Sequence, residues 1–275
     1  LSVGSSNYIF IILAIMIGGS FLWTMFTKRY MQSRLTGTTD FTQVKKKVFS
    51  KVVQYISPQF QYFENGHIGI AEFIDSLLFK FERYTLKGGD QIVGHYNGIP
   101  FQSCNLMVTF RPNMRNEKEG DDVVFYGNFF VARSPKTFEH PIVVRPVKGF
   151  FSDFNDNAIS TYLNYGGERI RLEDPEFEKQ FEVYCDDQIT ARYVLTPAFM
   201  QRLKKLNERH KGQVYFGINK NNIVIATNEG NSLMTVGSSP AAMLFQKIDL
   251  PMVESVYREL VEQLQMIDTL KLVDN

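Results

Sequence analysis

The longest apolar run of the chain covers residues 8–26 (YIFIILAIMIGGSFLWTMF) and contains no charged side chain. As a helix it would span about 28 Å, close to the hydrocarbon thickness of a bilayer. Basic residues follow the run instead of preceding it, which argues against a cleaved signal peptide and favours a cytoplasmic location for what comes next. The pattern predicts a transmembrane helix within residues 1–35. Its basic flank consists of Lys28, Arg29, Arg34, Lys45, Lys46, Lys47 and Lys51.

Small side chains form a strip within this predicted helix. Ala14 and Gly18 are four positions apart, and Gly19 and Ser20 lie beside them. Such a strip lets a second membrane helix approach closely, so it is a candidate interface between helices. The alternative is that glycine is simply common in membrane helices.

Residues 41–56 repeat apolar side chains at spacings of three and four, which predicts an amphipathic helix. The predicted apolar face comprises Phe41, Val44, Val48, Val52 and Tyr55. The lysines of this segment either rest on anionic headgroups or form an ordinary solvated face.

The remaining pattern alternates short β-rich runs with helical stretches. Asn97-Gly98 between residues 90–96 and 99–110 predicts a β-hairpin. Further strands are predicted at 123–133, 142–147, 169–172 and 181–185, with a second hairpin at 214–218 and 223–226. Helices are predicted at 68–81, after Asp174-Pro175, at 188–195, from Thr196-Pro197 to about 210, and from 249–251 onward. The fold class is therefore α+β: antiparallel hairpins and interleaved helices in one cytoplasmic domain, 36–275, with a subdivision allowed near 150–168.

Charge and cysteine content narrow the classes of function. A formal net charge of +1 gives no reason to expect a nucleic-acid partner. Two isolated cysteines, Cys104 and Cys185, make neither a disulfide framework nor a metal knuckle. The histidines do not repeat at metal-ligand spacing, so no metal or other cofactor is expected.

Clustered carboxylates are the candidate for catalysis that the sequence offers. Glu173, Asp174, Asp186 and Asp187 could divide acid and base roles in a hydrolase if they met in one cleft. The other interpretation is that Asp174 caps one helix, Asp186 or Asp187 caps the next, and the rest are solvated. No residue is predicted to be catalytic, and no catalysis is expected.

The segment 170–203 (IRLEDPEFEKQFEVYCDDQITARYVLTPAFMQRL) resembles the signature of a bacterial membrane-protein family of unknown function. Residues 94–106 and 123–138 and the basic stretch resemble it more loosely. Genes of that family often lie near those of LemA-type membrane proteins. Its members commonly carry two neighbouring membrane helices, so the resemblance implies that 8–26 is the second and 1–7 a short outer loop. It implies no catalytic residues.

The expected function is that of a scaffold or interaction protein in the bacterial inner membrane, with its main domain in the cytoplasm. The expected partners are the lipid bilayer, a membrane protein (LemA-type by resemblance) and further copies of the chain. Two alternatives stay open. A ligand or lipid sensor would need a deep apolar cavity, and a hydrolase would need the four acids to converge.

Overall fold

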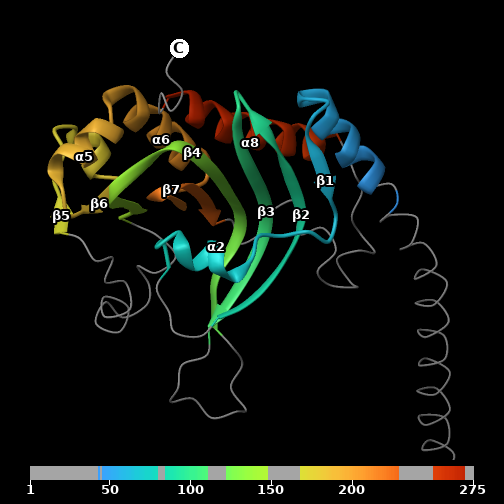
Figure 1. Cartoon of the computed structure of the whole chain (residues 1–275), viewed down its shortest axis with the longest axis horizontal. Coiled ribbons are helices and arrows are strands. Elements are labelled where there is room, and N and C mark those ends of the chain that lie inside the picture. Colours follow the sequence, from blue (N-terminus) through green and yellow to red (C-terminus); the bar gives the residue numbers. More distant parts are fainter. Residues whose placement is uncertain are drawn as a thin grey trace, which may run out of the picture. The chain divides into compact units, whose positions relative to one another are not determined.

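The computed structural model describes residues 43, 45–79, 84–110, 122–147, 168–228 and 250–269. Three of the sequence predictions lie outside these residues. They are the membrane helix with Ala14, Gly18, Gly19 and Ser20, the basic residues Lys28, Arg29 and Arg34, and the boundary near 150–168. No helix in the described ranges has the length and apolar character needed to cross a membrane. The chain divides into two units, Leu1–Lys47 with Val236–Lys247, and Val48–Thr235 with Ile248–Asn275. All labelled elements of Figure 1 belong to the second unit.

The described strands of this unit form a seven-stranded sheet, confirming the α+β class. All its strand pairs are antiparallel, and the order is β1-β2-β3-β4-β6-β5, with β7 also paired to β4. The strands are β1 (Gln61–Phe63), β2 (Tyr84–Tyr96), β3 (Ile99–Phe110), β4 (Asp122–Pro146), β5 (Glu168–Ile170), β6 (Phe181–Cys185) and β7 (Val214–Asn228).

The hairpin prediction at Asn97-Gly98 is confirmed. Both residues have positive φ, 50° and 78°, and they join β2 to β3. Asparagine and glycine tolerate this left-handed conformation, and the turn it makes matches the twist of the flanking strands.

The strand β4 was predicted as two strands and is one. It pairs with β3 in its first half, with β6 in its second half, and with β7 along both. The register between β4 and β7 shifts between Arg133 and Phe138 and again before Ile142. Extra residues on β4 are therefore absorbed as bulges, which bend a strand without ending it.

The predicted second hairpin around Lys220 is wrong, because residues 214–228 form the single strand β7. Lys220 does have a positive φ of 54°, but it lies opposite the bulged part of β4. The left-handed residue therefore accommodates a bend shared by both strands instead of reversing the chain.

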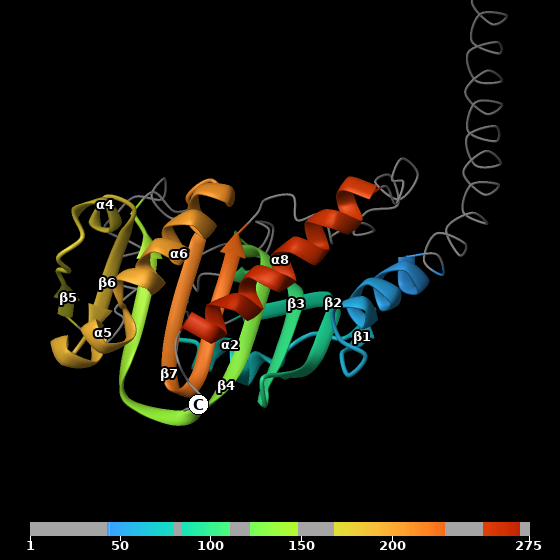
Figure 2. The same ribbon diagram turned by 90° about the horizontal axis from the view of Figure 1, so that it is seen from above.

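The helices are α2 (Ile70–Asp75), α4 (Pro175–Glu178), α5 (Gln188–Val194), α6 (Pro197–Arg209) and α8 (Leu250–Thr269), and residues 45–56 are also helical. The prediction for 68–81 was too long. Figures 1 and 2 show α6 and α8 over one face of the sheet and α2 over the other. On the α2 face, the rings of Phe73, Phe79, Phe125, Phe129 and Tyr215 form a buried aromatic cluster.

The helix 45–56 is present, but its predicted apolar face was displaced by one residue. Phe49 and Val53 are buried at 1% exposure, whereas Tyr55 is 83% exposed. Phe49 stacks on Tyr62, with ring centroids 5.9 Å apart. Burying this large ring stabilises the fold more than burying Val48 and Val52 would, and these two valines are left half-buried.

Candidate functional site

Helix α6 presents a long row of cationic side chains because its opposite face is held in the core. Thr196 caps it by accepting a hydrogen bond from the Phe199 N–H at 3.3 Å, and Pro197 occupies its first turn, as predicted. Phe199, Leu203 and Leu206 recur at spacings of four and three along the helix, and all three are buried. The outward side then carries Gln201, Arg202, Lys205 and Arg209.

Helix α8 lies beside α6 and supplies the second wall. Leu260, Leu264 and Ile267 are buried, and Asp268 fixes the helix to the β2–β3 turn. The Tyr96 hydroxyl and the Asn97 amide each donate to an Asp268 oxygen at 2.8 Å. Burial, aided by this hydrogen bond to a carboxylate, raises the pKa of Tyr96 to about 12. The position of α8 is therefore tied to the hairpin.

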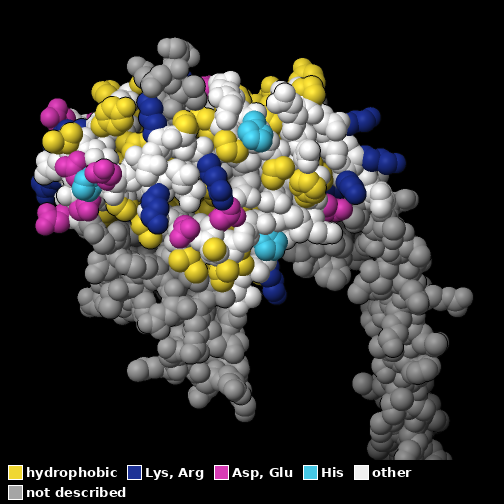
Figure 3. All heavy atoms as spheres, in the orientation of Figure 1, with side chains coloured by type: hydrophobic (Ala, Val, Ile, Leu, Met, Phe, Trp, Pro, Cys, Tyr) yellow, Lys and Arg dark blue, Asp and Glu magenta, His cyan; other side chains and the backbone are white. Residues whose placement is uncertain are grey.

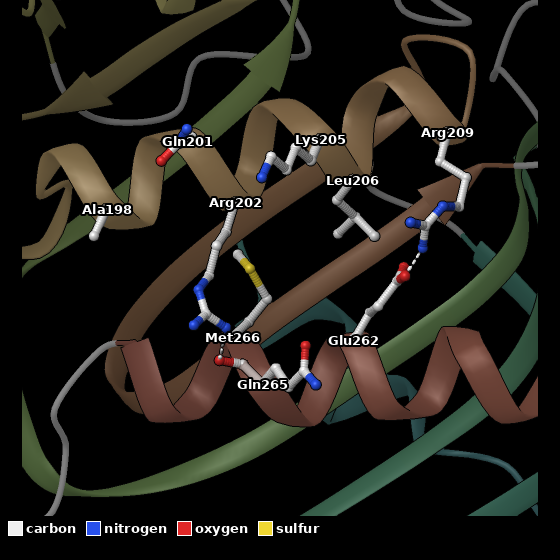
Figure 4. Close-up of a pocket in the computed structure, with 9 residues that line it drawn as sticks. All are labelled: Ala198, Gln201, Arg202, Lys205, Leu206, Arg209, Glu262, Gln265 and Met266. Carbon is white, nitrogen blue, oxygen red and sulfur yellow. Dashed lines mark hydrogen bonds and ion pairs between the residues drawn. The ribbon is translucent and has the colours of Figure 1, made fainter.

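Between the two helices lies a groove with a volume of about 550 Å³ (Figure 4). Its floor includes the buried side chains of Leu206 and Met266. Two contacts bridge it: Arg202 donates to the main-chain oxygen of Gln265 at 3.1 Å, and Arg209 forms an ion pair with Glu262. The lining residues are Ala198, Gln201, Arg202, Lys205, Leu206, Arg209, Glu262, Gln265 and Met266.

The groove carries an excess of positive charge. Three of its lining residues are cations and one, Glu262, is a carboxylate. Within the part of the chain that the structure describes, Lys205 is exposed and forms no ion pair or hydrogen bond. An apolar floor beside a cationic rim suits a ligand that carries both apolar and negatively charged groups.

The four candidate acids do not form a common site. Asp174 caps α4 by accepting hydrogen bonds from the Glu176 and Phe177 N–H groups, and Asp187 caps α5 through the Thr190 N–H. Asp186 contacts the imidazole of His140 at 2.8 Å, and Glu173 is exposed. Figure 3 shows acidic side chains together with cations at the end of the domain that carries α5 and β5. The acids are thus capping and paired groups, as the second interpretation of the sequence expected.

The two capping acids, Asp174 and Asp187, are stabilised in their ionised form. A hydrogen bond from Lys204 at 2.7 Å, together with those of the helix N–H groups, lowers the pKa of Asp174. Hydrogen bonds from the side chain and main chain of Thr190 lower the pKa of Asp187. A general acid at neutral pH needs a raised pKa, so neither carboxyl is suited to that role.

Replacing Asp174 with alanine is expected to lower the free energy of unfolding by about 1 kcal/mol at pH 7, because α4 loses its cap. The lowered pKa of the folded state means that this stability is present above the unfolded pKa of about 3.9 and is lost as the pH falls through the folded value. The difference between wild type and variant should therefore shrink at pH 3. Urea unfolding at the two pH values measures it, with the exposed Glu173→Ala as control. An equal difference at both pH values would contradict the assignment.

The other candidate residues of the sequence are not among those that line the groove. Lys46, Lys47 and Lys51 are exposed and Lys45 is buried. Burial raises the pKa of Cys104 to about 12 and also raises the pKa of Cys185, which disfavours the nucleophilic thiolate form of both. Among the residues described, no three or more His, Cys, Asp or Glu side chains are placed to hold a metal ion.

A second polar feature lies beneath α8. Asn105, Asn128 and Thr227 are directly opposite one another on β3, β4 and β7, and all three are buried. Gln263 of α8 is fully buried above this row and donates from Nε2 to Asn128 Oδ1 at 2.8 Å. Ser103 Oγ donates to the same oxygen at 3.1 Å. The network fixes where α8 lies on the sheet.

The groove was not predicted from the sequence, although the cationic wall that α6 supplies could have been recognised there. Arg202, Lys205 and Arg209 are spaced three and four residues apart on a helix that was predicted correctly, so they share one face. Glu262, Gln265 and Met266 are some sixty residues away along the chain. No periodicity in the sequence indicates that α8 lies against α6.

Comparison with known proteins places this region in a described family. Residues 123–272, which include both helices of the groove, match the model of the family described as "Protein of unknown function (DUF3137)". Curated protein sequences include no match to the chain. The crystal structure of the mycobacterial trehalose monomycolate transport factor A aligns over 84% of this chain and 98% of its own, at 10% identity and a TM-score of 0.38.

Proposed function

The chain belongs to the DUF3137 family, and from this premise we propose that it is a membrane-anchored scaffold or interaction protein that docks a partner in the groove between α6 and α8. The groove carries the proposal, because it combines an apolar floor with an excess of cations. A surface whose charge is complementary to that of a partner serves recognition and orientation. The lining of the groove contains no nucleophile beside a general base.

In this proposal, the apolar run 8–26 anchors the protein in the bacterial inner membrane, and the folded domain lies in the cytoplasm. Support comes from the length of the run and from the basic residues that follow it. Lys46, Lys47 and Lys51, being exposed, are available to anionic headgroups. The strip of Ala14 and Gly18 supports association with another membrane helix, from a second copy or from a partner.

The two alternative functions have less support. The hydrolase would require Glu173, Asp174, Asp186 and Asp187 to converge with raised pKa values, whereas two of them cap different helices with lowered ones. The sensor would require a deep apolar cavity, whereas the groove is lined mainly by polar and charged side chains. The resemblance to a family encoded near LemA-type proteins supports one such protein as a partner.

Gentle detergent extraction of the full chain from its native membrane, followed by native mass determination with identification of the subunits, tests the function. The expected result is a defined assembly with a second membrane protein or with further copies. A Gly18→Leu variant should weaken it if the small-residue strip contributes, whereas Ile12→Leu serves as the matched control. A clean monomer of the wild-type chain would contradict the proposal.

A further inference from the structure

The cations of the groove are arranged along a line. Arg202, Lys205 and Arg209 occupy positions i, i+3 and i+7 of α6 and extend for about 10 Å along one side of the groove. Two of them already have a contact across it, Arg202 with a main-chain oxygen and Arg209 with Glu262. Lys205, between them, is the one whose ammonium forms no hydrogen bond or ion pair with another described residue.

A row of positive charges beside an apolar floor favours some kinds of anionic ligand over others. A phosphate is bound best where several donors converge on one point, commonly the N–H groups at the start of a helix. The groove does reach Ala198 in the first turn of α6, but its three cations lie farther along the side of that helix, from the second turn onward, and do not converge on one point. An amphipathic helix matches this geometry, because its side chains repeat at the same three- and four-residue spacing and its apolar face can enter a groove between helices.

We propose that the groove binds an amphipathic helix of a partner protein whose acidic side chains face Lys205 and Arg202 and whose apolar side chains contact Leu206 and Met266. The inference rests on the proposed docking function and names the chemistry of the partner. Glu262 adds an orientation, because it is the carboxylate of the groove and lies on α8, whereas the three cations lie on α6. Like charges repel, so the bound segment turns its carboxylates toward α6 and away from α8.

Direct binding tests the inference with the full chain in nanodiscs of zwitterionic lipid. The probe is a fluorescent helical peptide of about 18 residues with leucine on one face and glutamate on both flanks of that face. A peptide with glutamine at the glutamate positions is its control. The protein variants are Lys205→Glu with Arg202→Glu, and Arg192→Glu, which reverses an exposed cation on α5 outside the groove.

Fluorescence anisotropy should show that the glutamate peptide binds wild type and Arg192→Glu alike and binds the double variant ~10-fold more weakly. A peptide with lysine in place of glutamate should in turn prefer the double variant, which shows that this variant is folded. Equal binding to all proteins, or equal binding of the glutamine peptide, would overturn the inference. So would binding of soluble dihexanoyl phosphatidylglycerol that depends on Lys205 while the peptide fails to bind.

Native mass determination of the double variant separates this inference from the proposed function. If the assembly seen with wild type persists in the double variant, the docking function stands and the groove is not its site. If wild type itself is a monomer, the docking function fails first. Loss of the partner from the double variant, with retention in Arg192→Glu, supports both.

Discussion

Replacement of Phe129 by alanine is expected to lower the free energy of unfolding by about 3–5 kcal/mol, the largest effect foreseen for a single residue. Phe129 is fully buried on β4 at the centre of the aromatic cluster. Its ring centroid lies 5.4 Å from that of Phe73 and 5.8 Å from that of Phe125. The substitution removes buried apolar area and two ring contacts and leaves a cavity that the paired strands on both sides cannot close.

Urea unfolding of the detergent-solubilised chain, followed by far-ultraviolet circular dichroism, measures this effect. Phe63→Ala is the matched control, because that ring is 46% exposed on the short strand β1, and its loss should cost less than about 1 kcal/mol. If both variants unfold at the same urea concentration, the cluster does not hold the sheet and α2 together as described.

Local features of the fold were predictable because local physics decides them. The left-handed turn at Asn97-Gly98, the cap of Asp174 before Pro175 and the cap of Thr196 before Pro197 each depend on a few neighbouring residues. In these three cases the residue types satisfy main-chain groups within one turn of themselves. Strand 181–185 was also predicted with its observed bounds, although its main-chain partners lie on β4 and β5.

The errors concern features that depend on distant residues. The bulges of β4 and β7 are set by how two long strands bend together, and Pro135 of β4 and the left-handed Lys220 of β7 lie in that bend. Tyr55 looked like a core residue by spacing alone, but the ring that is buried is Phe49, which stacks on Tyr62, whereas Tyr55 meets Tyr257 at the surface. The groove needs α8 against α6, a pairing fixed by contacts such as Asp268 with the β2–β3 turn.

Gln263→Leu is expected to lower the free energy of unfolding by about 2–3 kcal/mol, although leucine is the more apolar residue. The reason is that Gln263 is fully buried and is one of the donors to Asn128 Oδ1. Leucine would remove this donor and place an apolar side chain against the buried amide of Asn128 and the hydroxyl of Ser103. A buried polar group that loses its partner costs more than the hydrogen bond itself contributed.

The double variant Gln263→Leu with Asn128→Leu distinguishes this account from simple loss of packing. Because both partners become apolar, the double variant should be less destabilised than the sum of the single variants by about 1–2 kcal/mol. Gln201→Leu, on the exposed side of α6, should change stability by no more than about 0.5 kcal/mol. Additive effects of the two buried substitutions would show that the amides are not coupled, and α8 would then be held on the sheet by its apolar side chains alone. Coupling, in contrast, would mean that the polar row of the sheet selects the position of α8 and thereby the width of the groove.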